Sequence, residues 1–435
     1  MKIKKILFKI TLFAIFVGGS FTSFSQNEVA YARKVIDTLA SPRYDGRGYI
    51  ENGDKLASAF IAGEFKKSGL IPLNKGSYFQ PFDLSVNTFP GKMVVKLNDE
   101  LLIPGADYLI QTTSPSVHGK FNVISVTRSD INTSDKLNQI ISKAHKSFIL
   151  IDNRRPANES MEDQKIINDN IEILKTEKDL NFKGLIIFSY DKLTWTTLTY
   201  QEKRPVIIIN KKDFDPSKIH TIQVDVDAVF VPKYTTRNVV GMIKGTLNVD
   251  STIVITAHYD HLGQMGKGTY FPGANDNASG TSMMLCFVKY YAAHPPKYNT
   301  VFIAFSGEEI GLLGSEAFVE NPLADLSKIK FLVNFDLAGT GDEGIKVVNG
   351  SIFKNQFNLL VKLNDEYKLL PKIEERGEAC ISDHCRFYRK GVPSFFIYTL
   401  GGIAAYHDIY DRSETLPLTE FENYFELMVK FFAAI

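Results

Sequence analysis

The chain has 435 residues, of which 44% are hydrophobic and 23% are charged, as in an ordinary globular protein. Its 50 basic and 49 acidic residues nearly balance, so the charge does not indicate a nucleic-acid partner. The length allows about two to three domains, each with a substantial core.

The first 25 residues are typical of a cleavable export signal. A basic start leads into an apolar run at residues 6–17, and small residues then suit cleavage before Gln26. The basic residues are Lys2, Lys4, Lys5 and Lys9. The apolar run is too short, and too interrupted by Gly and Ser, to favour a membrane span. We therefore expect export to the periplasm or the medium, without a stable membrane anchor. Removal of these four lysines from the 50 basic residues would leave 46, against 49 acidic ones.

Two helices are predicted in residues 26–90, the first part of the mature chain. Apolar residues recur at helical spacing over residues 28–39 and 54–68. Between them, residues 42–48 form a polar loop that ends in D-G-R-G. These helices are expected to belong to the same domain as the C-terminal half.

Residues 91–233 are interpreted as an inserted β-rich domain. A polar stretch at residues 153–179, with one predicted helix, interrupts the strands. The strands are expected at residues 93–97, 121–126, 147–151, 184–188, 206–209 and 221–231. Three scattered histidines, His118, His145 and His220, are interpreted as surface or structural residues and not as ligands.

Residues 234–435 alternate between short apolar strands and helices. Strands are expected at residues 238–244, 252–257, 300–305, 331–335, 346–348 and 394–398. Helices are expected at residues 278–293, 310–320, 352–367, 384–390 and 419–434. This alternation predicts an α/β domain with a mixed, mostly parallel sheet that is covered by helices on both faces.

Side chains that can bind metals follow three of these strands. His258 follows the strand at residues 252–257, Glu308 and Glu309 follow the strand at 300–305, and Asp336 follows the strand at 331–335. In such sheets, ligands gather beyond the carboxyl ends of the strands. We therefore expect these four side chains at a common site.

Shorter motifs add three candidates. Asp276 lies in G-A-N-D-N-A-S-G and could bridge two cations, although capping of a helix by Asp276 or Asn277 is an equal alternative. Asp260, two residues after His258, is placed to orient that imidazole. His407 lies in Y-H-D-I-Y-D.

Each acid also has a plain structural interpretation. Glu308 and Glu309 could be acids in the first turn of a helix, and Asp336 could cap a turn. Their occurrence together with two histidines favours a metal site. Two imidazoles and three carboxylates suit a pair of divalent cations, and the remaining glutamate can act as a general base.

With these motifs, residues 238–416 resemble the zinc-dependent peptidase family of bacterial secreted aminopeptidases and glutamate carboxypeptidase II. The resemblance implies peptide substrates and two zinc ions, with Glu308 as the general base and Asp260 orienting His258. One zinc would be bound by His258, Asp276 and Asp336, and the other by Asp276, Glu309 and His407. The family also implies a cis peptide bond between Asp276 and Asn277.

The resemblance extends over most of the mature chain. Residues 91–233 are similar to a protease-associated domain, notably in K-S-F-I-L-I-D, F-K-G-L-I-I-F and R-P-V-I-I-I-N. We therefore expect a zinc aminopeptidase-like α/β fold with an inserted, β-rich protease-associated-like domain.

Two departures from the family concern the pocket. Family members often have Y-H-T-P-S-D where this chain has Y-H-D-I-Y-D. Some also carry a Tyr just before the Ser-Asp-His segment to assist the oxyanion, whereas residues 378–381 here contain none. Tyr406 or another tyrosine of the pocket is our candidate replacement.

Three cysteines are present. Cys380 and Cys385 could close a disulfide loop or remain free thiols, and both alternatives stay open. Cys286 lies on a predicted apolar helix, where we expect it to be buried.

The resemblance favours an aminopeptidase, with three alternatives. A glutaminyl-peptide cyclotransferase uses the same fold with one zinc and a Trp-lined pocket, but the only tryptophan here, Trp195, lies in the inserted segment. A carboxypeptidase is possible because the motifs predict hydrolysis and not which peptide end is read. A non-catalytic binding protein is disfavoured because all six positions are present.

Overall fold

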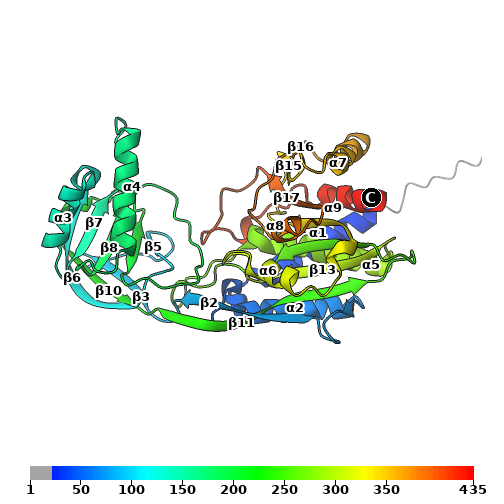
Figure 1. Ribbon diagram of the computed structural model, residues 1–435, viewed down its shortest axis with the longest axis horizontal. Helices are drawn as coiled ribbons and strands as arrows, with labels where there is room; N and C mark the ends of the chain where they lie inside the picture. Colours follow the sequence, from blue (N-terminus) through cyan, green and yellow to red (C-terminus); the bar gives the residue numbers. More distant parts are fainter. Residues whose placement is uncertain (1–21) are drawn as a thin grey trace, which may run out of the picture.

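The computed structural model describes residues 22–435, which form two lobes joined by long strands (Figure 1). The predicted export signal lies almost wholly outside the described residues. Among residues 22–435, no helix combines the length and apolar character that crossing a bilayer requires.

The main lobe is built on a nine-stranded sheet within the described chain. Its order is β1-β11-β13-β12-β14-β17-β15-β16, and β2 also pairs with β11. The central strands β12, β13, β14 and β17 are parallel, whereas β11 and β15 run antiparallel to their central neighbours. The strands are β1 (Ile71–Pro72), β2 (Phe79–Thr88), β11 (Val229–Ile243), β12 (Thr252–His258), β13 (Asn299–Phe305), β14 (Ile329–Phe335), β15 (Gly344–Val348), β16 (Ile373–Glu375) and β17 (Ser394–Leu400). The predicted mixed sheet is confirmed, with four parallel pairs, three of them at its centre, and four antiparallel pairs in the described chain.

Helices cover both faces of this sheet, because its central strands are apolar on both sides. Ile253 and Ile255 of β12 pack in the same cluster as residues of α1, α5 and α9. Val254, between them, packs on the opposite side with Phe318 of α6 and Phe387 of α8. The helices are α1 (Thr22–Leu39), α2 (Gly53–Lys67), α5 (Gly280–Ala293), α6 (Leu313–Glu320), α7 (Lys354–Tyr367), α8 (His384–Arg389) and α9 (Phe421–Ala434). Continuous apolar strands of this kind are what a doubly covered sheet requires.

The second lobe, which we call the module, has its own eight-stranded sheet in the described chain, ordered β4-β3-β10-β6-β7-β8-β9-β5. Its strands are β3 (Met93–Leu97), β4 (Glu100–Leu101), β5 (Tyr108–Ile110), β6 (Val117–Thr127), β7 (Phe148–Asp152), β8 (Gly184–Phe188), β9 (Val206–Ile209) and β10 (Thr221–Val226). Helix α4 (Met161–Thr176) lies in the predicted polar stretch, and α3 (Ser134–Lys143) was not predicted. Both helices pack on the parallel strands β7 and β8.

The prediction of one strand over residues 221–231 is wrong. Strand β10 ends at Val226 in the module sheet, and β11 begins at Val229 in the main sheet. Asp227 lies at the break and accepts a hydrogen bond from the backbone N–H of Lys92 at 2.7 Å. The apolar residues on either side continue across a point where the chain changes sheets, so hydrophobicity alone gives no signal of the break.

Candidate metal centre

The predicted ligands converge at the carboxyl edge of the main sheet. β12 ends at His258, Glu308 follows the end of β13, and Asp336 follows the end of β14. Because β12 lies between β13 and β14 in the sheet, the three strand ends are neighbours. Asp276 and His407 reach the same place from loops.

Asp276 stands between the two imidazoles. Its Oδ1 lies 3.4 Å from Nε2 of His258, and its Oδ2 lies 3.1 Å from Nε2 of His407. The Nε2 of His258 is also 3.4 Å from Oδ1 of Asp336, and that of His407 is 3.2 Å from Oε2 of Glu309. The five side chains therefore form two sets of nitrogen and oxygen donors that share one carboxylate.

The loop that carries Asp276 is held from two sides. The peptide bond between Asp276 and Asn277 is cis, which confirms the prediction. The carboxylate of Asp411 accepts hydrogen bonds from the backbone N–H groups of Asn275 at 2.8 Å and Asp276 at 2.9 Å. The side chain of Asn277, and not that of Asp276, accepts a hydrogen bond from the N–H of Gly280, the first residue of α5, at 2.8 Å. The carboxylate of Asp276 is thus left to face the imidazoles.

Asp260 organises the loop that carries the two glutamates. Its carboxylate accepts hydrogen bonds from the hydroxyl of Tyr49 at 2.7 Å and from the N–H groups of Glu308 at 3.2 Å and Glu309 at 3.3 Å. The Nδ1 of His258 lies 3.2 Å from the carbonyl oxygen of Asp260 and 3.7 Å from its carboxylate. The carbonyl and carboxylate oxygens of Asp260 that face Nδ1 are acceptors, so they favour a proton on this nitrogen. Nε2 is then left for a metal.

Two residues near the centre were missed by the sequence reasoning. His261 is buried, and its Nδ1 lies 2.7 Å from Oε1 of Glu309. Arg47 is also fully buried and has no carboxylate within ion-pair distance among the described residues. Its guanidinium instead donates to the carbonyls of Leu39, Tyr259, Pro272, Gly273 and Asp276. The D-G-R-G motif and the second histidine of H-Y-D-H were the available signals.

Burial and the neighbouring carboxylates act in opposite directions on the two imidazoles. Burial alone would lower the pKa of His407, but Glu309 and Asp276 outweigh it and raise the pKa to about 11. Burial opposes a raised pKa at His258 as well, yet Asp336 and Glu308 hold that pKa well above its usual value. Both imidazoles therefore carry a second ring proton in the metal-free protein, and a metal ion would have to replace it.

The carboxylates divide in the same way. Burial raises the pKa of Glu308 well above its usual range, with only partial compensation from His258. The imidazoles of His407 and His261 overcome the effect of burial at Glu309 and hold its pKa well below the usual range. Adjacent glutamates thus differ strongly in proton affinity, as expected for a ligand beside an acid–base group.

The donor set fits zinc. Imidazole nitrogen and carboxylate oxygen are common zinc ligands, and ligand atoms of His258, Asp276 and Glu309 lie within 4.8 Å of one another. So do those of His258, Glu308 and Asp336. Four carboxyl groups converge on the two imidazoles, and holding several carboxylates together away from water is costly without cations.

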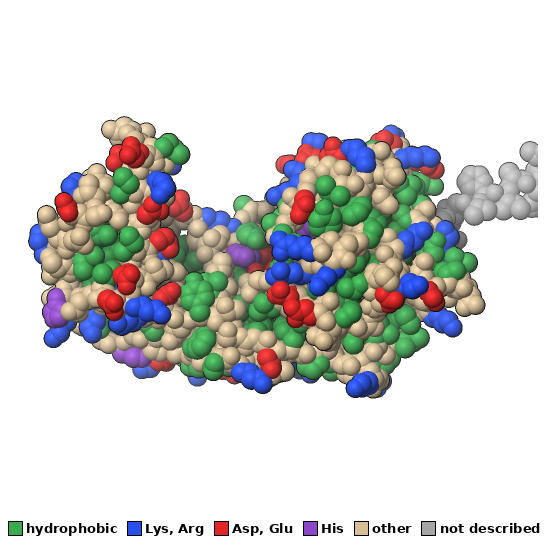
Figure 2. Space-filling model, viewed as in Figure 1, with side chains coloured by type: hydrophobic (Ala, Val, Ile, Leu, Met, Phe, Trp, Pro, Cys, Tyr) green, Lys and Arg blue, Asp and Glu red, His purple; other side chains and the backbone are tan. Residues whose placement is uncertain are grey.

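A cavity of about 540 Å³ opens over these residues. Besides the ligands, it is lined by Leu312, Leu337, Ile381, Phe396, Tyr398 and Tyr406. The cavity therefore combines a polar floor with an apolar wall. The surface is hollowed between the two lobes (Figure 2).

Cys380 and Cys385 form a disulfide beside this cavity, which settles the alternative that the sequence left open. Cys286 is a buried free thiol, as expected.

A larger cavity, of about 750 Å³, lies elsewhere between the lobes, near Pro42, Tyr270 and Arg412. It is lined by none of the predicted ligands. Size alone therefore does not identify the functional cavity in this protein.

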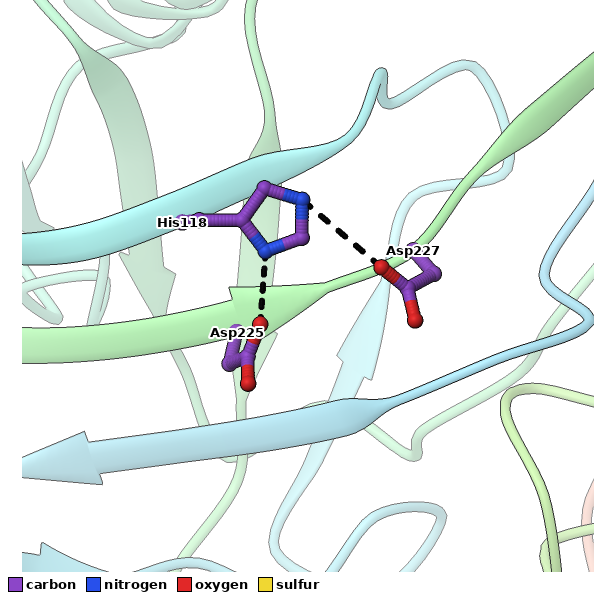
Figure 3. A group of neighbouring side chains, drawn as sticks. All are labelled: His118, Asp225 and Asp227. Atoms are coloured by element: carbon purple, nitrogen blue, oxygen red, sulfur yellow. Dashed lines mark hydrogen bonds and ion pairs between the residues drawn. The ribbon is translucent and has the colours of Figure 1, made fainter.

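A second histidine–carboxylate group lies on the module surface (Figure 3). Nδ1 of His118 is 2.6 Å from Asp225, but it is the opposite ring nitrogen that faces Asp227, at 3.7 Å. Lys92 also pairs with Asp225 at 3.0 Å. Because the two carboxylates face different nitrogens and a lysine already neutralises one, these residues form a surface ion-pair cluster.

Residues 238–432 match peptidase family M28, a range that contains all the predicted ligands and Glu308. Among curated relatives, aminopeptidase YwaD of Bacillus subtilis (strain 168) is 38% identical over 112 residues, 25% of this chain and 23% of the relative. A probable leucine aminopeptidase of Trichophyton verrucosum (strain HKI 0517) is 34% identical over 181 residues, 39% of this chain and 47% of the relative. The chain thus spans less than half the length of these two relatives.

Solved structures extend the likeness to both lobes. The structure of BSAP, a zinc aminopeptidase from Bacillus subtilis, has a TM-score of 0.66 and 20% identity, covering 93% of this chain and 94% of that chain. An aminopeptidase from Aneurinibacillus sp. strain AM-1 has a TM-score of 0.61 and 20% identity, covering 94% of each chain. At these identities the likeness shows a shared fold. This chain therefore shares its fold with these two aminopeptidases, and its residues 238–432 match peptidase family M28.

Proposed function

We propose that the chain is an exported di-zinc aminopeptidase that removes N-terminal residues from peptides. The observation that carries the proposal is the position of Asp276, whose two carboxylate oxygens face two different imidazoles at 3.4 and 3.1 Å. A single carboxylate between two donor sets is the arrangement that a pair of metal ions requires. The aminopeptidase names of the relatives support the same reaction class.

The proposed ligands fall into two sets around Asp276. His258, Asp276 and Asp336 would hold one zinc, and Asp276, Glu309 and His407 would hold the other. Zinc in these positions supplies Lewis acidity toward the scissile carbonyl and lowers the pKa of water.

Glu308 is the proposed general base. It lies at the site without being needed as a ligand, and its backbone N–H is held by Asp260 at 3.2 Å. Its carboxylate takes a proton from the attacking water and delivers it to the leaving amine. Burial raises the pKa of Glu308, which matches a group that must hold a proton for part of the cycle.

The apolar wall of the cavity supports a substrate with an apolar first side chain. Leu312, Ile381 and Phe396 line it beside the proposed ligands. Burial of an apolar side chain there is favourable by about 25 cal/mol for each Å² removed from water. We therefore expect Leu- or Phe-initiated peptides to be better substrates than Asp- or Glu-initiated ones.

The test is mass spectrometry of products after the zinc-loaded mature protein meets a peptide panel. The panel holds Leu- and Asp-initiated peptides, each with a free and with an N-acetylated N-terminus. It also holds peptides that begin with Gln. Stepwise loss of N-terminal residues from the free peptides alone is the expected result. Loss of ammonia from N-terminal Gln would instead identify a cyclotransferase, and shortening from the other end would identify a carboxypeptidase.

We also propose that residues 1–25 direct export and that residues 91–233 are a protease-associated-like domain inserted into the peptidase domain. The separate sheet of the module supports the second proposal. Sequencing the N-terminus of protein recovered from the periplasm or medium tests the first, with Gln26 as the expected first residue.

A further inference from the structure

A long connection in the module reaches into the proposed metal centre. It joins the neighbouring parallel strands β8 and β9, and residues 189–205 contain no helix or strand. We call residues 191–200 the strap. Irregular connections of this length are uncommon in compact domains and usually have a function.

The strap makes two hydrogen bonds with His407. The backbone N–H of Trp195 donates to the carbonyl of His407 at 2.9 Å, and the carbonyl of Trp195 lies 3.0 Å from Nδ1 of His407. A carbonyl can only accept, so Nδ1 must carry a proton. Once the second ring proton is displaced, the lone pair is on Nε2, the nitrogen that faces Asp276 and Glu309. The strap thereby selects the tautomer and the ring orientation that a metal needs.

Trp195 is itself fixed by both lobes. Its side chain is only 4% exposed, and its indole N–H donates to the carbonyl of Ile110 on β5 at 2.6 Å. The indole stacks on the ring of Phe271, which lies in the main lobe after β12, with ring centroids 4.6 Å apart. The carbonyl that meets His407 therefore projects from a tightly packed aromatic residue.

Two further strap residues hold the same side of the centre. The hydroxyl of Thr197 donates to the carbonyl of Glu309 at 2.9 Å. The ammonium of Lys192 donates to the carbonyl of Tyr406 at 3.0 Å and pairs with Asp408 at 2.8 Å. These contacts lie next to His407, whose φ of 53° is a conformation that its surroundings must enforce.

We propose that the strap is a positioning element for the zinc site formed by Asp276, Glu309 and His407, so that the module sets the affinity of that site. The inference rests on the proposed function, because it assumes zinc at this centre. The other set, with His258 and Asp336, is held from within the main lobe, so the strap acts on one zinc and not on both.

The test uses the full mature chain, freed of metal and titrated with zinc against a chelator of known affinity. The variants are Lys192→Met, Thr197→Val and Trp195→Ala. Lys212→Met and Thr194→Val are the matched controls, because both residues are exposed and lie on the same module. Thermal unfolding of the metal-free proteins checks that each variant is folded.

We expect two zinc ions per chain in the parent protein and in the controls. In the three strap variants, one of the two zinc dissociation constants should rise by about 10- to 100-fold, the usual effect of removing an outer partner of a ligand, while the other stays unchanged. Trp195→Phe, which keeps the stacked ring but loses the indole N–H, should fall between the parent and Trp195→Ala.

Parent-like affinity for both zinc ions in folded Lys192→Met and Thr197→Val would overturn the inference, even if Trp195→Ala did not fold. Equal weakening of both zinc ions, in step with a lower melting temperature of the metal-free protein, would also overturn it, because a merely structural role predicts that result. A parent protein that binds no zinc would contradict the proposed function itself.

Discussion

His261 and Glu309 form a buried pair in which Nδ1 of the imidazole lies 2.7 Å from Oε1 of the carboxylate. The other carboxylate oxygen of Glu309 faces His407 at 3.2 Å. The Nε2 of His261 is buried without a hydrogen-bond partner in the described part of the chain, so the ring makes its hydrogen bond through Nδ1. His261 therefore fixes which oxygen of Glu309 is available to a metal.

Replacing His261 with Leu should weaken one zinc by about 10- to 100-fold, because the carboxylate of Glu309 loses the partner that orients it. His261→Asn is the matched control, since its amide N–H can occupy the place of Nδ1 and no partner is lost at Nε2. Zinc titration of both variants is the measurement. Equal affinities in the Leu and Asn variants would show that the Nδ1 contact does not orient the ligand.

Replacing Glu308 with Gln should leave both zinc ions bound while lowering kcat by about 10²- to 10⁴-fold, the range attributed to general acid–base catalysis. The amide keeps the size of the side chain but cannot take a proton. Glu320→Gln, on the exposed end of α6, is the control and should keep parent activity. Parent-like kcat in Glu308→Gln would refute the assignment of the base.

Zinc binding should release protons and tighten as the pH rises. In the metal-free protein, the carboxylates raise the pKa of His407 to about 11 and that of His258 well above its usual value, so both rings are protonated near neutral pH. A metal ion must displace these protons, and affinity then rises by up to about tenfold per pH unit for each proton released. Calorimetry in buffers of different ionisation enthalpy counts them, and about two per chain are expected. Zinc affinity that is flat between pH 6 and 9 would contradict this reasoning.

Arg47→Met should destabilise the metal-free protein by several kcal/mol, because each buried carbonyl left without its donor costs about 1–3 kcal/mol. The substitution leaves five buried carbonyls without the guanidinium that they share. Arg43→Met, in the same loop but exposed, is the control and should change stability by less than about 0.5 kcal/mol. Urea unfolding of the two variants measures the difference, and matching midpoints would show that Arg47 is dispensable to the fold.

The parts of the site that the sequence predicted are local. His258 and Asp336 follow apolar strands, and a parallel sheet brings such strand ends together whatever the loops do. The fold class followed from the same strand–helix alternation. Strand β2 was missed because Pro81 and polar residues interrupt its pattern, which an outer strand paired only with β11 tolerates.

The parts that the sequence did not predict depend on contacts between distant residues. Trp195 meets His407 across 212 positions of sequence, and Arg47 reaches the carbonyl of Asp276 across 229. No periodicity or motif records such pairs. No contact with the metal centre was predicted for Trp195, and no role separate from that of His258 was predicted for His261, the second histidine of H-Y-D-H.

The most direct test of the two-zinc centre is anomalous diffraction at the zinc edge from crystals of the zinc-loaded protein. Two peaks about 3.5–4 Å apart are expected, the usual separation in two-metal sites, with Asp276 between them. One peak should lie about 2.0–2.2 Å from ligand atoms of His258 and Asp336, and the other at that distance from Glu309 and His407. A single peak, or peaks at the surface cluster of His118 and Asp225 alone, would contradict the proposed centre.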